Sequence, residues 1–590
     1  MIPGEAMGGN LTPPAAADRS VTARRSWPFL LATALFVAIR LPLLLPSGLF
    51  QGWHSDAAIF GLMGKRMLEG EISLFFWGQN YMGPLTSAIV AAWALLLRPV
   101  VDSPTVWPLA LRLATMSAVW GGIALIRAGA RWHVPAAAEL LALLLAIGPP
   151  LLYRSSLVTL GPEMVLLAGG LLFWMAARHL AAPNGAGMLD GTRGRFLFGL
   201  AAGIGWWMNQ GIVFFLIGIG CVVIGRTEGW ARFRGGIRLR DRLLFRGEAL
   251  GWPPLSPAAR AGLILLESIP LGLLALYLLH NLVTPAVRPL FHAHPIAEPL
   301  AMLGLIHLAA AFVQRESWTR PRAAGLRRIA AHLAPYAAGF LLGWAPVWLG
   351  AIAGWYPKAE TFEIRINRPS DVLASARRLA TGLSPDWLGL GRGAIGVAAL
   401  GSIVLVTCRL GWRHRVELGR LIRLEPHRYG IVGLAAATAG ANVAYYLVTQ
   451  SHERTIHYLM ASVPMLALLF SMGIAELWAT MRTAGGRVAA ALAFTVLVAS
   501  MATGAMRLNA ALLAEPDPRA IIREIERRGY SVCYAETGVA YELQYLSGES
   551  VRMIVWKSMV RNPAEAERLR AAPGPKCVVG SDGTVTELEE

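Results

Sequence analysis

Residues 52–85 read GWHSDAAIFGLMGKRMLEGEISLFFWGQNYMGPL and follow an apolar segment, 27–46, that is long enough to cross a membrane. Asp56 therefore lies where the chain has just left the bilayer. A carboxylate costs roughly 2.5–3.5 kcal/mol at the centre of a membrane helix, so a position at the water boundary is informative. The polar and aromatic loop behind Asp56 is much longer than a connection between two spans requires. The stretch predicts an interfacial helix over 54–69 and chemistry at the membrane surface.

The composition is that of an α-helical polytopic membrane protein. Of the 590 residues, 55% are hydrophobic and 15% are charged, and the mean hydropathy is +0.50, whereas soluble domains carry about 25% charged residues. The formal charge of +18 would suggest a nucleic-acid partner in a soluble protein. Here the arginines cluster between apolar segments, which is the usual signal for cytoplasmic loops. We therefore expect a lipid bilayer and no nucleic acid.

About thirteen membrane spans are predicted. They lie at roughly 27–46, 108–126, 136–153, 161–180, 196–208, 211–225, 262–281, 299–313, 332–354, 394–411, 430–449, 457–478 and 487–506. Residues 84–98 are apolar but short, and we assign them to a juxtamembrane or partly inserted helix. With this assignment arginine-rich loops fall on one side, and loops with acids, histidines and aromatics fall on the other. The N-terminus is then cytoplasmic, and Asp56 and the C-terminus are exterior.

Three regions follow from these patterns. Residues 1–26 are a disordered cytoplasmic N-terminus, 27–508 a transmembrane domain, and 509–590 a small soluble exterior α/β domain. The tail contains a capped amphipathic helix, DPRAIIREIERRG, three strands, YSVCYAE, VRMIVW and KCVVG, and helical stretches over 537–547 and 563–571.

The four cysteines show no zinc-site spacing. Cys221 and Cys408 fall in apolar spans and are expected in the core. Cys533 and Cys577 fall in predicted strands of the exterior domain. Both a disulfide and two buried thiols are compatible with the sequence, because a bridge requires a Cα separation of about 4.4–6.8 Å.

Two acids are candidate catalytic residues. Asp56 begins the interfacial helix, although an acid after a span is often only a solvated loop residue. Glu163 begins the fourth span within YRSSLVTLGPEMVLLAGG. There the helix dipole alone would favour it by about 0.3–1 kcal/mol. The predicted topology places both acids on one membrane face, where they can share acid–base and orienting roles.

Candidate donor-binding residues lie in the same outer loops. They are His54, Lys65, Gln79, Tyr81, Arg154, Lys358, His452, Arg454, His457 and Tyr458. Within SHERTIHY, 451–458, Arg454 can bond two phosphate oxygens at once, although interface anchoring explains the cluster equally well. His292 and His294 are too weak a signal for a metal site, so no cofactor is predicted and a divalent metal is left open.

These features together resemble the polytopic GT-C glycosyltransferases, which use polyprenyl-phosphate-linked sugars. The likeness is to protein O-mannosyltransferases, lipid A aminoarabinose transferases and, more closely, RgtA-type bacterial membrane proteins. Besides the Asp56 loop it rests on LRLATMSAV at 111–119, LGPEM at 160–164, GIGWWMN at 203–209, ERTIHYLMASVP at 453–464 and the tail YAETGVAYELQYLSGESV.

The resemblance implies that Asp56 is the catalytic base and Glu163 the second acid. Here the family's Asp-Glu pair is reduced to SDA, and the second acid is Glu rather than Asp. These departures weaken the case for a catalytic metal.

The predicted function is transfer of a sugar from a polyprenyl-phosphate donor to an envelope glycan, lipid or protein at the outer face of a bacterial inner membrane. The alternative is a transporter or lipid-glycan flippase, for which polar groups near mid-membrane and two related halves would be expected. The sequence names neither the sugar nor the acceptor.

Overall fold

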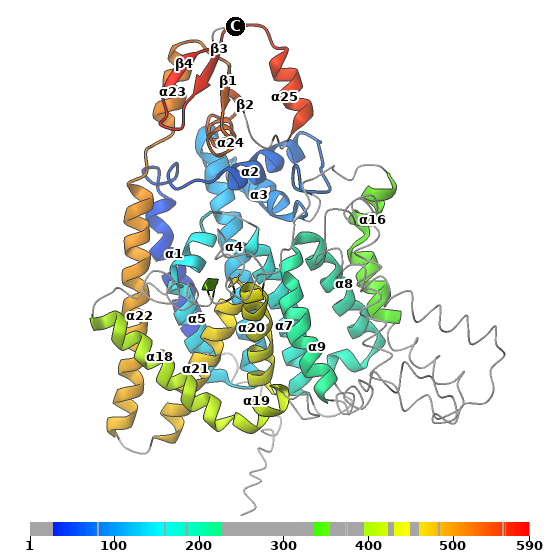
Figure 1. Cartoon of the computed structure of the whole chain (residues 1–590), viewed down its shortest axis with the longest axis vertical. Coiled ribbons are helices and arrows are strands. Elements are labelled where there is room, and N and C mark those ends of the chain that lie inside the picture. The colour runs from blue at the N-terminus through cyan, green and yellow to red at the C-terminus, as the bar shows by residue number, and fades with distance from the viewer. Residues whose placement is uncertain are drawn as a thin grey trace, which may run out of the picture.

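The computed structural model describes residues 27–79, 82–158, 161–182, 187–226, 334–353, 372, 374–375, 394–422, 430–448, 459–481, 484–556, 560 and 562–588. A helical part occupies most of its length, and a small sheet with three helices covers one end (Figure 1). The predicted spans at 262–281 and 299–313 lie outside the described residues.

Helices form on each predicted span that the structure describes. The helices are α1 Trp27–Arg40, α2 Ser55–Leu68, α3 Leu85–Leu97, α4 Ser103–Arg131, α5 Pro135–Ile147, α6 Pro150–Ser155, α7 Pro162–Ala181, α8 Thr192–Met208, α9 Val213–Arg226, α16 Ala345–Ile352, α18 Ala394–Arg413, α19 Arg415–Ile422, α20 Ile431–Val448, α21 Ser462–Thr480 and α22 Ala484–Leu513. Short 3-10 turns lie between some of these helices: η3 Leu41–Leu43, η4 Met188–Asp190 and η5 Gln210–Ile212. Within the described ranges, four helices are long and apolar enough to cross a membrane: Pro104–Arg131, Pro162–Ala181, Ser462–Thr480 and Ala490–Leu513. The total of thirteen spans stays a prediction.

Helix contacts are made partly through glycines. A Cβ on Gly122 of α4 would come within 2.5 Å of the Leu166 carbonyl oxygen, and one on Gly170 of α7 within 2.6 Å of the Gly122 oxygen. The two backbones therefore touch, as small residues allow in membrane helices.

Large apolar side chains cover the outer faces of the helices, as a lipid environment favours. Leu405 and Leu492 are 68% and 57% exposed. Cys408 on α18 is also exposed, so the prediction that it lies in the core is wrong. Lipid tails are as apolar as a protein core, and the apolar pattern of a membrane helix therefore does not tell its inner from its outer face.

The loop after η3, which the sequence predicts to be the first outer loop, contains the two short helices α2 and α3. Helix α2, 55–68, agrees with the predicted 54–69, and α3 covers 13 residues of the apolar segment 84–98, whose assignment outside the full spans stays a prediction. Ser55 and residues 57–64 of α2 are buried. The helix is thus covered on both sides, rather than lying with one face open to water.

The C-terminal unit is a four-stranded sheet of order β2-β1-β3-β4. The strands are β1 Val532–Ala535, β2 Arg552–Val555, β3 Lys576–Val579 and β4 Val585–Glu587, and the helices are α23 Arg519–Arg527, α24 Thr537–Leu546 and α25 Pro563–Arg570. Strand β1 is parallel to β2 and β3, and β4 is antiparallel to β3. The prediction of three strands missed β4, because three residues are too few to show alternation. Helix α22 runs to Leu513, five residues past the predicted domain boundary at 508.

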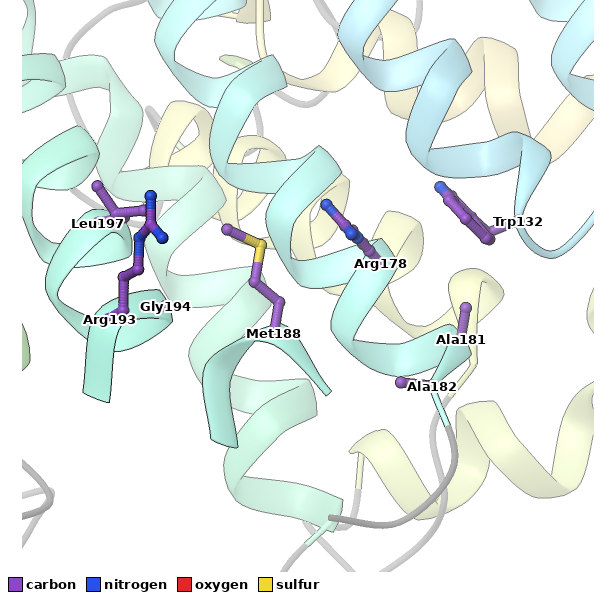
Figure 2. Close-up of a pocket in the computed structure, with 8 residues that line it drawn as sticks. All are labelled: Trp132, Arg178, Ala181, Ala182, Met188, Arg193, Gly194 and Leu197. Atoms are coloured by element: carbon purple, nitrogen blue, oxygen red, sulfur yellow. The ribbon is translucent and has the colours of Figure 1, made fainter. Parts of the chain in front are cut away.

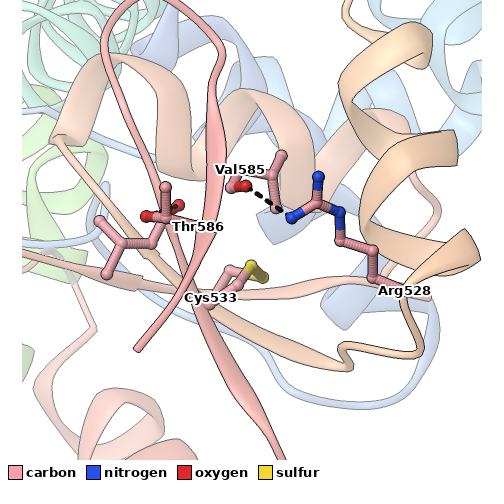
Figure 3. The surroundings of a disulfide bond; sticks show 6 residues. Arg528, Cys533, Val585 and Thr586 are labelled. Atoms are coloured by element: carbon pink, nitrogen blue, oxygen red, sulfur yellow. Dashed lines mark hydrogen bonds between the residues drawn. A yellow bond between two sulfur atoms is a disulfide. The ribbon is translucent and has the colours of Figure 1, made fainter. Parts of the chain in front are cut away.

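Cys533 and Cys577 are paired neighbours on β1 and β3 and form a disulfide with a Cα–Cα distance of 4.4 Å. Figure 3 shows the bond beside β4, whose Val585 carbonyl accepts a hydrogen bond of 3.0 Å from Arg528. Both cysteines are fully buried, so the bridge belongs to the core of the domain.

Candidate functional site

Asp56 lies in the first turn of α2, where the backbone leaves an extended conformation at His54. The Nδ1 atom of His54 accepts a hydrogen bond of 3.2 Å from the Asp56 amide and so caps the helix. The Asp56 side chain is 28% exposed, and its Oδ2 lies 3.9 Å from His54 Nδ1. A half-buried carboxylate at a helix N-terminus is stabilised as an anion and keeps access to a proton donor.

Arg154 joins this site from the last turn of α6. Burial lowers the pKa of His54; the charge of Asp56 raises it in part, and that of Arg154 lowers it again. The imidazole is therefore held neutral, which the cap requires because Nδ1 must accept a hydrogen bond. His54 and Asp56 thus lie together, and the exposed Arg154 is near enough for its charge to act on His54.

Glu163 is fully buried in the first turn of α7. Its Oε1 accepts a hydrogen bond of 3.3 Å from Thr86 Oγ1 on α3. The preceding Gly161 has φ +94°, a conformation that glycine adopts without strain. The side chain therefore points toward α3 and the first outer loop, and its burial favours a role in holding the site together.

Asn209, in the break between α8 and α9, is a residue that the sequence analysis did not assign. Its Nδ2 donates to the Gly161 carbonyl at 3.3 Å, and its Oδ1 accepts from the Gly211 amide at 2.8 Å. Its backbone pairs with Met82 of the first outer loop. One side chain thus connects the turn before Glu163 with that loop. The interruption NQG in an otherwise apolar stretch was the available signal.

The aromatic loop after α2 is held by main-chain contacts. The Phe76 amide donates to the Met82 carbonyl at 2.8 Å, and Trp207 Nε1 donates to the Leu74 carbonyl at 3.0 Å. Gln79 is buried there, 8% exposed. These contacts fix the loop against the end of α8.

Arg40 and Arg112 are fully buried, and their spacing in the sequence gave no sign of a shared role. Arg112 donates to the carbonyls of Leu49 and Leu157 at 3.3 and 3.4 Å and also to that of Gln51. Its guanidinium lies 4.8 Å from the ring centroid of Trp53.

Arg40 on α1 makes similar hydrogen bonds to the end of α5 and the end of α6. Its Nη1 donates to the Ala146 carbonyl at 2.8 Å, and its Nε donates to Ser156 Oγ. The two arginines fasten the chain before Asp56 to the segment that carries Arg154.

Lys65 lies at the other end of α2, against the C-terminal domain. Its Nζ is 2.6 Å from Glu549 Oε1, and Arg66 Nη2 is 2.7 Å from Glu549 Oε2. The hydroxyl of Tyr545 on α24 donates a hydrogen bond of 2.6 Å to the Trp107 carbonyl. The Tyr545 ring also packs on Trp53, with ring centroids 5.6 Å apart. The domain therefore sits directly on the helix that carries Asp56 (Figure 1).

The remaining predicted donor-binding residues lie outside the described residues. They are Tyr81, Lys358, His452, Arg454, His457 and Tyr458. Among the residues that the structure does describe, no group of three or more His, Cys, Asp or Glu side chains is placed to hold a metal ion.

No protein-family model and no curated protein matches the chain. Among solved structures, ArnT from Cupriavidus metallidurans bound to undecaprenyl phosphate is 14% identical, with a TM-score of 0.48, over 93% of this chain and 92% of that one. AglB from Archaeoglobus fulgidus, an archaeal oligosaccharyltransferase in complex with an inhibitory peptide and a dolichol-phosphate, is 12% identical, with a TM-score of 0.48, over 92% of this chain and 65% of that one. At such identities and with TM-scores below 0.5, the function of this chain is inferred from its own residues.

Proposed function

We propose that this protein is a membrane glycosyltransferase that transfers a sugar from a polyprenyl-phosphate donor to an envelope acceptor, with Asp56 as the general base. The observation that carries the proposal is the placement of Asp56 at the N-terminus of helix α2, with its side chain 28% exposed and 3.9 Å from His54, whose imidazole also feels the charge of Arg154. The two groups that such a transfer needs, a carboxylate base and a cation, are then present at one end of the molecule.

In the reaction, the Asp56 carboxylate takes the proton of an acceptor hydroxyl. The hydroxyl oxygen then bonds to the anomeric carbon of the donor sugar, and the bond between that carbon and the phosphate oxygen breaks. The electron pair leaves with the polyprenyl phosphate. A positioned base contributes about 10²–10⁴-fold to such a step.

The departing phosphate requires cationic donors. Arg154 is the described candidate, and Arg454 with His452 or Lys358 is the predicted set in the remaining outer loops. The polyprenyl tail requires a path in contact with lipid, which a multi-pass membrane protein provides. We place the site on the periplasmic or exterior side of the inner membrane.

The C-terminal domain is proposed to limit acceptor access. Its Glu549 pairs with Lys65 of α2, and its Tyr545 packs on Trp53, three residues before Asp56. A truncation after Leu513 should therefore impair acceptor use more than donor binding.

The test is transfer by purified, reconstituted protein from a panel of synthetic polyprenyl-phosphate sugars. Asp56→Asn should reduce transfer by about 10²-fold or more while leaving donor binding within a few-fold. Asp102→Asn is the matched control, because Asp102 is an exposed acid that precedes α4 on the same side. Near-normal turnover by Asp56→Asn would remove the assignment. Donor movement across the bilayer without any transfer would favour the flippase alternative.

A further inference from the structure

A second basic site lies at the opposite end of the helical part from α2. A cavity of about 600 Å³ opens there between the ends of α4 and α7, the turn η4 and the start of α8. Figure 2 shows Arg178 of α7 and Arg193 of α8 on either side of Met188, with Trp132 beyond Arg178. Ala181, Ala182, Gly194 and Leu197 complete the wall.

The charge of this cavity is positive and not balanced by the acids around it. Asp190 is engaged with the Gly187 amide at 2.7 Å and lies 3.8 Å from His179 Nδ1. Glu139 pairs with Arg127 and Arg131. No lining residue is acidic. Within the described part of the chain, neither Arg178 nor Arg193 has an ion pair with a carboxylate, and the cavity therefore attracts an anion.

The rest of the lining is apolar and lies at a helix end, where lipid and water meet. Trp132 is 60% exposed and Leu197 is 37% exposed. Tryptophan is enriched at membrane interfaces, and apolar walls suit an acyl chain better than they suit a hydrated ion. Two guanidinium groups beside an apolar wall match the two parts of a phospholipid, its phosphate and its chains.

We propose that this cavity binds the phosphate headgroup of an anionic membrane lipid in the leaflet opposite to Asp56. Arg178 and Arg193 bond the phosphate, and Met188, Leu197 and Trp132 contact the upper acyl chains. The site is independent of the proposed transferase activity and requires only that the helical part is embedded in a bilayer.

The test uses the full chain in detergent and native mass spectrometry with phosphatidylglycerol or with phosphatidylcholine of the same acyl chains. The wild-type protein should retain one phosphatidylglycerol in clear preference to phosphatidylcholine. The double variant Arg178→Gln/Arg193→Gln should weaken that binding by about 30-fold, since each basic residue near a membrane surface contributes about one factor of five.

Two further variants distinguish binding in this cavity from general electrostatic attraction between surface arginines and anionic lipid. Arg413→Gln/Arg415→Gln is the matched control, because Arg415 packs on the exposed Trp412 and begins α19, which lies at the same end of the molecule (Figure 1). It should change binding by less than twofold. Leu197→Trp keeps both arginines, places a larger ring in the wall of the cavity, and should also weaken the binding of the retained lipid.

Unchanged binding in Arg178→Gln/Arg193→Gln, or in Leu197→Trp, would overturn the proposal and leave the arginines as interface anchors. Inorganic phosphate that displaced the lipid at equal concentration would also overturn it, because the acyl chains would then contribute nothing. If a variant fails to fold, Arg178→Lys/Arg193→Lys keeps the charge and removes bidentate bonding. It should show an intermediate loss, and wild-type affinity there would equally refute the site.

Discussion

Arg112 stabilises the site through the backbone rather than by contacting a substrate. Its guanidinium is fully buried and donates to the carbonyls of Leu49, Gln51 and Leu157, which belong to segments before α2 and after α6. A buried charge is tolerated only where its donors are used, and here main-chain oxygens use most of them. The position of Asp56 relative to Arg154 therefore depends on this residue.

We predict that Arg112→Gln destabilises the protein by about 1.5–3 kcal/mol, because at least two buried carbonyls lose a charged donor. The measurement is the thermal unfolding midpoint in detergent. Arg98→Gln is the control, since Arg98 is exposed and lies only over the Trp107 ring, 5.5 Å from its centroid. Equal midpoints for the two variants would contradict the holding role of Arg112.

Glu542 on α24 gives the contact between the two parts of the molecule a pH dependence. Burial, with a smaller contribution from Glu515, raises the pKa of Glu542 from 4.5 to about 7. The folded state therefore binds the proton more tightly than the unfolded state. The resulting stabilisation is complete below about pH 4.5 and is lost as the pH rises through about 7.

Stability of the docked domain should accordingly fall between about pH 4.5 and pH 7 in the wild-type protein, and Glu542→Gln should flatten this dependence. Unfolding midpoints measured across that range provide the check. Glu536→Gln, at the exposed position immediately before the same helix, is expected to keep the wild-type slope. A slope in Glu542→Gln as steep as in the wild-type protein would assign the pH dependence to another group.

Helices α2 and α24 meet because one of them lacks a side chain at the point of contact. A methyl group on Gly61 would overlap the Tyr545 ring, whereas one on Gly538 of α24 would meet nothing within 4 Å. The ion pairs of Glu549 with Lys65 and Arg66 lie at the rim of the same contact. Partly exposed pairs add little, so the close approach at Gly61 dominates.

Gly61→Ala and Gly538→Ala should therefore have opposite effects. Alanine in a helix gains up to about 1 kcal/mol over glycine, so Gly538→Ala should be neutral or stabilising. Gly61→Ala should push α24 away and expose the segment between α22 and α23 to protease. Limited proteolysis with hydrogen exchange over α24 measures both. Wild-type protection from protease and hydrogen exchange in Gly61→Ala would show that the Tyr545 ring moves aside without loss of stability.

For the whole molecule, the position of the C-terminal domain and the oxidation of its cysteines are linked. The domain covers the same end as α2 (Figure 1), and its Cys533–Cys577 bridge is expected to persist only in an oxidising compartment. The other two cysteines, Cys221 and Cys408, are not joined by a disulfide. Disulfide state therefore reports on which side of the membrane Asp56 lies.

Maleimide labelling of denatured protein from cells should modify two cysteines before reduction and four after it. Cys533→Ala/Cys577→Ala should leave two labelled in both cases and cost about 2–4 kcal/mol of domain stability. Cys221→Ala/Cys408→Ala is the control and should show none before reduction and two after it. Four labelled cysteines in unreduced wild-type protein would place the domain, and Asp56 with it, in the cytoplasm.

Sequence patterns within short segments predicted much of the secondary structure of this protein. Apolar length located the described helices, and the change of composition after α22 located a separate α/β unit. The start of α2 at Ser55 agrees with the predicted 54–69 because a helix N-terminus is set by the residues next to it. Asp56 and Glu163 were selected as candidates for the same reason, since each follows a local break in an apolar run.

Contacts between distant segments were decided only in the tertiary structure. Neither the carbonyl partners of Arg112, nor the three-way contact of Asn209, nor the pairing of Lys65 with Glu549 follows from spacing. The opposition of Cys533 to Cys577 depended on parallel strand register. The exposure of Cys408 depended on which helix face meets lipid. In each case the energy comes from a partner many residues away, and a local sequence pattern has no information about where that partner lies.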